Sequence, residues 1–235
     1  YSSQKDFKIQ WQHSQDSKAH PYKTFSASVN LVSSSYNQYT TSLSDYLTNT
    51  TTSSIAFSTR FGDNWNFSAN LGESYNINTK YITLDLPSIT LSSNQFHPFK
   101  KKRKSGKTYW YDDITVAYRM NMINKIETYD SLLFKDDFYK NMSNGIEHYI
   151  PIESSVKVLK YLNWTNSINY TERWYSNKTV KKYNQETGLI DKDTNYTFFA
   201  NRDANFSSSL NTRIYGMFSF KKGYIKAVRH VFNPT

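Results

Sequence analysis

The sequence has 235 residues, of which 37% are hydrophobic and 17% aromatic, with a mean hydropathy of -0.73. Because disordered chains are depleted in aromatic residues, this composition indicates apolar residues that alternate with Ser, Thr and Asn, and not a lack of structure. The net charge of +10 favours an anionic partner such as nucleic acid, phospholipid or a phosphorylated glycolipid.

The sequence also bears on whether the protein crosses a membrane. No run approaches the roughly 18 apolar residues of a membrane-spanning helix, which excludes a helical membrane protein. A membrane β-barrel stays possible, because its strands carry only alternating signals. The chain contains no Cys, so neither disulfides nor thiolate chemistry is available. Since no targeting segment precedes Tyr1, we expect a processed chain or part of a longer one.

The clearest strand pattern begins at residue 24. Here Phe25, Ala27, Val29 and Leu31 alternate with small polar residues, which places apolar and polar side chains on opposite faces of a β-strand. The same period of two returns at 54–61 and at 65–72. Only Gly62, Asp63 and Asn64 separate these two runs, which predicts a tight hairpin.

Further strands follow in chain order, with long polar loops expected at 35–50, 125–144 and 176–194. We expect a hairpin within 70–80, then a strand over 80–92 with a bulge at Pro87, where the apolar phase shifts. Residues 114–122 predict one strand, and 145–160 and 162–175 predict two strands joined by a short turn near Tyr161. A single extended strand is expected over 198–220, followed by a turn at Lys221 and a final strand.

These patterns give roughly nine or ten strands joined as sequential hairpins, with short turns at one end and long loops at the other. Several runs exceed the roughly 9 to 11 residues with which a strand crosses a bilayer, whereas strands of soluble sandwiches typically have about five or six. The predicted fold is all-β, an antiparallel transmembrane β-barrel segment that forms part of a larger barrel. If the turns at Gly62, near Tyr161 and at Lys221 are periplasmic, strand counting places the segment 100–107 on the same side.

In such a barrel, one set of side chains faces a water-filled lumen and the other faces lipid. The sparse charges of the polar faces carry both signs, and lining the lumen explains them better than a specific substrate site does. The residues expected to face the lumen are Ser26, Ser28, Asn30, Arg60, Arg119, Glu147, Lys157, Arg173 and Arg213. Those expected to face lipid are Phe25, Val29, Leu31, Phe67, Val116 and Ile214.

The dense basic run is a second candidate site. It is either a solvated loop near lipid headgroups or a contact for a phosphorylated ligand or acidic partner. Nucleic acid is disfavoured, because no aromatic residues are interleaved with this run. The basic residues are Lys100, Lys101, Lys102, Arg103, Lys104 and Lys107.

Other site chemistries have weak support in the sequence. No His stands in a metal-ligand spacing, so no metal and no cofactor are expected. A Ser, His, Asn phospholipase site is disfavoured because nothing selects one Ser over the others, so we predict no catalytic residue and no enzyme activity. Several Trp, including Trp65, Trp110, Trp164 and Trp174, lie near predicted strand ends, where an interfacial aromatic girdle would place them.

Several segments resemble the barrel of the lipopolysaccharide-assembly protein family LptD, in the branch found in Bacteroidota. They are WQHSQDSKAHP at 11–21, FSASVN at 25–30, LPSI at 86–89, HPFK at 97–100, NYTERWY at 169–175 and KAVRHVFNPT at 226–235. The resemblance implies that residues 1–235 are part of a single outer-membrane barrel domain, with an N-terminal jellyroll domain and the terminal strands outside this chain.

The resemblance also implies a function. Such a barrel is an integral protein of the outer membrane of a Gram-negative bacterium and is plugged by an LptE-like lipoprotein. It receives lipopolysaccharide from a periplasmic bridge and releases it sideways into the outer leaflet, among the outer-membrane lipids. The alternative functions are a porin or nutrient-uptake barrel, whose strands would look alike, and a soluble or surface-displayed β-adhesin.

Overall fold

The structure is a computed structural model that describes residues 7–33, 36, 43, 49–100, 109–135, 138, 142–159, 161–185, 188–222, 224 and 226–234. The chain divides into two compact units. Unit 1 comprises residues 1–94, 119–148 and 172–202, and unit 2 comprises residues 95–118, 149–171 and 203–235.

The elements whose bounds the structure defines are strands and two short 3-10 helices, η1 (Trp110–Asp113) and η2 (Asp130–Leu132). The all-β prediction is therefore confirmed. The strands are β1 (Lys8–Ser14), β2 (Lys23–Val32), β3 (Thr50–Phe61), β4 (Trp65–Asn76), β5 (Tyr81–Ser93), β6 (Ile114–Val116), β7 (Arg119–Tyr129), β8 (Met142–Val158), β9 (Leu162–Tyr175), β10 (Lys178–Tyr183), β11 (Ile190–Asn195), β12 (Phe199–Thr212), β13 (Ile214–Ser219) and β14 (Ala227–Phe232).

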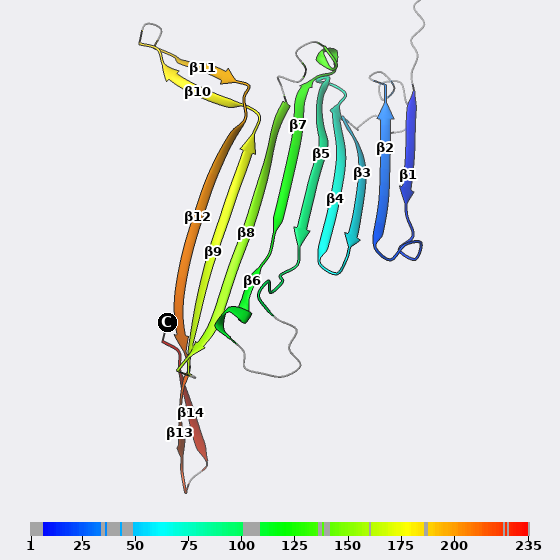
Figure 1. Ribbon diagram of the computed structural model, residues 1–235. Helices are drawn as coiled ribbons and strands as arrows, with labels where there is room; N and C mark the ends of the chain where they lie inside the picture. Colours follow the sequence, from blue (N-terminus) through cyan, green and yellow to red (C-terminus); the bar gives the residue numbers. More distant parts are fainter. Residues whose placement is uncertain are drawn as a thin grey trace, which may run out of the picture. The chain divides into compact units, whose positions relative to one another are not determined.

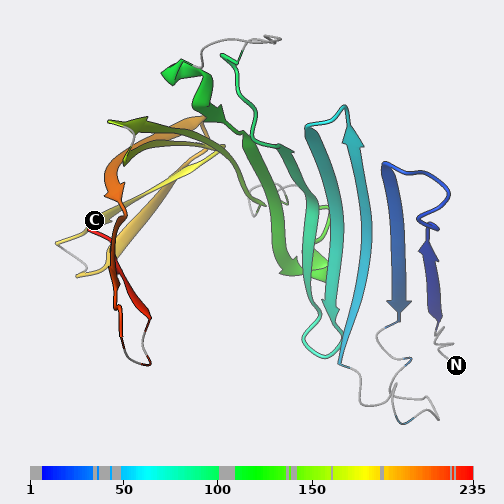
Figure 2. The same ribbon diagram turned by 90° about the horizontal axis from the view of Figure 1, so that it is seen from below.

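Ten of these strands form one sheet, which agrees with the predicted nine or ten. The order is β1-β2-β3-β4-β5-β7-β8-β9-β12, and β6 pairs with β8. Within unit 1, Figure 1 shows β2, β3, β4, β5 and β7 side by side, and they remain neighbours in the turned view of Figure 2. These neighbouring strands pair antiparallel, so the end of each strand lies at the same edge of the sheet as the start of the next.

The predicted hairpin turns are confirmed. Between β3 and β4, Gly62 adopts a φ of 60°, a left-handed conformation that favours glycine. Between β4 and β5, the Asn76 side chain accepts hydrogen bonds from the backbone N–H groups of Asn78 and Thr79, which closes the turn inside the segment 70–80. Between β8 and β9, Leu159 adopts a φ of 51° beside Tyr161.

Pairing across unit 1 assigns its side chains to two faces, because residues directly opposite each other point to the same side. One row joins Phe25 to Phe57, Phe57 to Ala69, Ala69 to Ile89 and Ile89 to Met122. We call the side that carries this row the apolar face. The opposite side, which carries the intervening Ser, Thr and Asn residues, is the polar face.

A β-bulge in β5 keeps the apolar side chains on one face. The register of β4 and β5 shifts between Asn70 and Gly72, where β4 advances by two residues while β5 advances from Asp85 to Ser88. Leu86 and Pro87 fall in this interval, so the bulge predicted at Pro87 is confirmed, and a residue without an N–H donor lies where the ladder is interrupted.

The buried core of unit 1 lies on the apolar face beyond the bulge. Ile82, Leu84 and Ile126 are buried there, and Ile126 has no exposed surface. Leu133 and Phe138, from the connection between β7 and β8, pack against this cluster. The connection therefore covers one end of the apolar face.

Four expectations about the loops and strands were wrong. The strand expected over 114–122 is divided into β6, which pairs with β8, and β7, which pairs with β5. The loop expected at 176–194 contains the hairpin of β10 and β11, which alternation failed to reveal because pairs such as Lys181 with Lys192 leave it without an apolar face. The strand expected over 198–220 is divided into β12 and β13, and β13 pairs with β14 in a separate two-stranded sheet. The loop expected from residue 125 starts later, because β7 continues to Tyr129 and buries Ile126.

Candidate functional site

The polar face of unit 1 carries two arginines in one row across four strands. Arg60 of β3 lies opposite Asn66 of β4, Asn66 opposite Ser92 of β5, and Ser92 opposite Arg119 of β7. Three inter-strand steps of about 4.8 Å separate the two arginine backbones by about 14 Å. The Arg60 Nη2 donates a hydrogen bond to the Asp63 carbonyl oxygen at 2.9 Å, which ties this guanidinium to the β3–β4 turn.

Hydroxyl groups fill the next row of the polar face. Ser58, Ser68, Thr90 and Asn121 lie opposite one another on β3, β4, β5 and β7. Thr24 joins this row through a 2.6 Å contact between its Oγ1 and the Ser58 Oγ, and Thr90 Oγ1 donates to Asn121 Oδ1 at 3.2 Å. A cavity of about 290 Å³ lies over this row and Arg60. The surface is therefore neutral and hydrogen-bonding, with cations spaced along one edge.

A second cavity on the polar face contains an ion pair. The Arg173 Nε of β9 lies 2.9 Å from the Glu147 Oε2 of β8, and both side chains line a cavity of about 490 Å³ together with Thr90 and Asn121. Because the two charges compensate each other, this part of the face is close to neutral.

In unit 2, the structure brings together two of the cations predicted from sequence. Lys157, near the end of β8, and Arg213, directly after β12, line a cavity of about 800 Å³. Sequence alone placed them on the same kind of face but gave no reason to expect them at one site, since they are 56 positions apart in the chain.

Most of the other residues predicted from the sequence lie on one of the two faces of unit 1. Phe25, Val29, Leu31 and Phe67 lie on the apolar face of unit 1, whereas Ser26, Ser28, Asn30, Arg60 and Arg119 lie on its polar face. Their assignment to lipid and to a lumen remains a prediction, because pairing defines the faces and not what touches them.

Val116 and Ile214 lie outside this set of paired rows. Val116 pairs with Ile152 through the short strand β6, and Ile214 pairs with Phe232 in the β13–β14 sheet. Lys100 is exposed and follows a turn in which its N–H donates to the His97 carbonyl oxygen. Lys101, Lys102, Arg103, Lys104 and Lys107 lie outside the described residues.

Among the described residues, no group of His, Asp or Glu side chains has the arrangement of a metal site. In the same part of the chain, no helix is long and apolar enough to cross a membrane.

The model of the protein family described as LptD protein matches residues 1–235. This chain belongs to the LptD family. Comparisons with curated proteins and with solved structures found no match.

Membership in the LptD family relates the sheet to a known type of membrane protein. LptD proteins are outer-membrane β-barrel proteins that act in the transport and assembly of lipopolysaccharide. The antiparallel sheet of ten strands agrees with a segment of such a barrel. The chain therefore belongs to a family of transport and assembly proteins.

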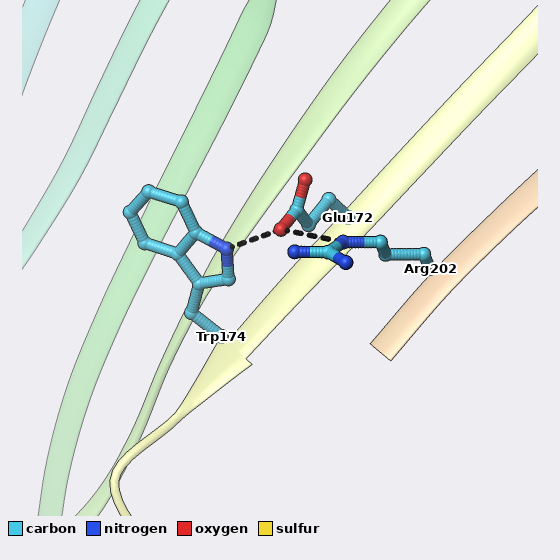
Figure 3. Close-up of polar contacts among 3 residues, drawn as sticks. All are labelled: Glu172, Trp174 and Arg202. Carbon is cyan, nitrogen blue, oxygen red and sulfur yellow. Dashed lines mark hydrogen bonds and ion pairs between the residues drawn. The ribbon is translucent and has the colours of Figure 1, made fainter. Parts of the chain in front are cut away.

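Sequence analysis missed one polar cluster of this LptD-family chain, formed by Glu172 and Trp174 of β9 and Arg202 of β12. Figure 3 shows that the Glu172 Oε1 accepts hydrogen bonds from the Trp174 indole Nε1, at 2.9 Å, and from the Arg202 Nε, at 3.1 Å. The Glu172 side chain is 17% exposed and the Arg202 side chain 67%. The rings of Trp174 and Phe198 meet edge to face, so the carboxylate lies beside aromatic surface.

A signal in the sequence could have located this cluster. Along each strand, Glu172 and Arg202 occupy positions that alternation assigns to the same face as apolar residues. Trp174 has the parity of Glu172, and Phe198, Ala200 and Phe206 have the parity of Arg202. Charges in an apolar register need partners, which predicts that each finds the other across paired strands.

We expect the Glu172 and Arg202 pair to contribute little to stability, because the guanidinium is mostly exposed. A double-mutant cycle of Glu172→Gln and Arg202→Gln, measured by urea unfolding of the full-length protein in lipid vesicles, should give a coupling energy below about 1 kcal/mol. A coupling energy of about 3 kcal/mol or more would mean that the pair is desolvated, contrary to this expectation.

Proposed function

We propose that this chain forms part of an outer-membrane lipopolysaccharide translocon that inserts lipopolysaccharide into the outer leaflet. The protein is integral to the outer membrane of a Gram-negative bacterium. The apolar face contacts lipid, and the polar face lines the path of the saccharide headgroup. The proposal rests on family membership and on the chemistry of the two faces.

The apolar face supports the membrane part of this proposal. Among the described residues only five hydrophobic residues are buried, namely Ala27, Ile77, Ile82, Leu84 and Ile126. On the same face of unit 1, Trp11 is 52% and Leu71 38% exposed. A large apolar surface that the chain itself leaves uncovered is characteristic of contact with a membrane or a partner.

The observation that carries the transport part is the polar face. Its rows of Ser, Thr and Asn offer donors and acceptors without fixed charge, which suits the hydroxyl groups of a passing saccharide. Arg60 and Arg119 add isolated positive charges that suit phosphate groups. Transport breaks no covalent bond, so the proposed function requires no catalytic residue.

Two partners belong to the same proposal. An LptE-like lipoprotein plugs the barrel, and a periplasmic bridge delivers lipopolysaccharide to it. The basic run at 100–107 contacts one of these partners or the phosphate groups of the cargo, because dense positive charge attracts anionic surfaces.

Depletion of the protein tests the proposed function directly. We expect lipopolysaccharide on the cell surface, measured by labelling intact cells, to fall sharply and to return when the parent gene is expressed again. Unchanged surface lipopolysaccharide with a loss of solute uptake would instead assign the chain to a porin or uptake barrel.

Extraction of membranes with carbonate tests the third alternative. Release of the protein from membranes by carbonate would assign it to a peripheral adhesin.

A further inference from the structure

We propose that the cavity in unit 2 that holds Lys157 and Arg213 binds a phosphate group attached to a saccharide. This inference rests on the proposed function and identifies which part of the lipopolysaccharide headgroup this site recognises. The residues that line the cavity are Lys157, Tyr161, Asn163, Asn211, Thr212, Arg213, Asn233 and Pro234.

Three strand ends build the cavity. Lys157 lies at the end of β8 and Asn211 at the end of β12. Tyr161 belongs to the β8–β9 turn, and Asn163 is the second residue of β9. Thr212 Oγ1 donates a hydrogen bond to the Tyr161 carbonyl oxygen at 2.8 Å, which ties the end of β12 to the β8–β9 turn. The hydrogen bond therefore joins the strand end beside Arg213 to the turn that follows Lys157.

The charge in this cavity is uncompensated. No Asp or Glu lines it, and neither Lys157 nor Arg213 takes part in an ion pair within the described part of the chain. Glu153, on the same strand as Lys157, is four residues away, which is about 13 Å along a strand. By contrast, the Arg173 cation of unit 1 is paired with Glu147. A phosphate group supplies the negative charge that the cavity lacks.

The uncharged residues of the lining indicate which chemical group the bound phosphate is attached to. Asn163 and Asn211 each present an amide with donors and an acceptor, and Tyr161 adds a phenol ring and hydroxyl group. This set matches the hydroxyl groups and ring faces of a sugar better than an acyl chain, which would leave the amides without hydrogen-bond partners. The volume of about 800 Å³ also exceeds what a free phosphate ion fills.

Photo-crosslinking in cells tests the site. A photoreactive amino acid at Ser209, on β12 with the parity of Asn211 but outside the cavity lining, reports lipopolysaccharide nearby. We expect the combined changes Lys157→Gln and Arg213→Gln to lower the cross-link yield roughly tenfold or more, because charge-assisted hydrogen bonds are lost. An unchanged yield in a protein that assembles normally would overturn the inference.

A matched control removes two positive charges elsewhere. Lys181 and Lys192 face each other across β10 and β11, and Lys181→Gln with Lys192→Gln should leave the Ser209 cross-link at the parent level. Equal losses in the two double variants would show a general effect of charge and would contradict a specific site.

A binding measurement keeps the inference testable if the neutral variant fails to assemble. The full-length protein that carries only the Ser209 reporter, in its native complex, should bind chemically dephosphorylated lipopolysaccharide roughly tenfold more weakly than intact lipopolysaccharide. Lys157→Arg with Arg213→Lys should retain the preference, since both charges remain. Equal binding of the two forms, or complete competition by inorganic phosphate alone, would overturn the proposed saccharide phosphate.

A second reporter separates this inference from the proposed function. Ser68 lies on the polar face of unit 1, outside the unit 2 cavity. Cross-linking at Ser68 that persists while Ser209 shows no dependence on Lys157 and Arg213 would overturn only the unit 2 site. Absence of cross-links at both positions, with normal surface lipopolysaccharide after depletion, would overturn the proposed function itself.

Discussion

Replacing Ile126 with Ala is expected to destabilise the protein by about 2 to 5 kcal/mol, the range for removing a large buried aliphatic side chain. Ile126 has no exposed surface and lies opposite Leu84 in the β5–β7 pair. The cluster includes Ile82, with Leu133 and Phe138 packed against it, so little of the resulting cavity can close. Urea unfolding of the full-length protein in lipid vesicles measures the change.

Ile123 provides the matched control for this prediction. It lies on the same strand, three residues away and on the opposite face, and is 55% exposed. Ile123→Ala should change the free energy of unfolding by less than about 1 kcal/mol. If the two variants cost the same, the buried cluster does not stabilise the sheet in the way that its packing indicates.

Replacing Ala69 with Arg is expected to cost about 2 to 4 kcal/mol, the range for a basic residue placed on the lipid face of a membrane barrel near the bilayer midplane. Ala69 lies between Phe57 and Ile89 in the row of apolar side chains that crosses unit 1. The proposed lipid contact would force the guanidinium out of water, whereas no such cost arises on a wet face.

Ser68→Arg is the control, because Ser68 is the neighbouring residue on the polar face, opposite Ser58 and Thr90. It should cost less than about 1 kcal/mol in the same vesicle unfolding assay. A larger loss for Ser68→Arg than for Ala69→Arg would exchange the two faces and contradict the proposed lumen.

The sequence predicts most of the sheet, because alternation is a local signal that directly reflects strand geometry. Phe25, Val29 and Phe67 have the parity of the apolar face, and Gly62 marks a hairpin that the structure contains. The shift of apolar phase at Pro87 also located the bulge. In each of these cases a few neighbouring residues determine the local geometry.

What the sequence did not predict depends on strands that meet from distant parts of the chain. The Lys157 and Arg213 cavity, and the contact of Glu172 with Arg202, both require knowing which strand lies beside β9. The division between β12 and β13 was missed for a related reason. Apolar parity continues from Phe206 to Phe218, although the pairing partner changes after Thr212.

The bulge at Pro87 determines which changes in length β5 tolerates. Between the pairs Asn70–Ser88 and Gly72–Asp85, β5 contains one residue more than β4, so losing one residue here would remove the bulge and leave Ile82 and Leu84 in the buried cluster. If the present sequence formed a regular ladder instead, every side chain between this point and the β4–β5 turn would change face, and Thr83 and Asp85 would take the place of Ile82 and Leu84. The extra residue and the bulge are therefore compatible with the fold only together.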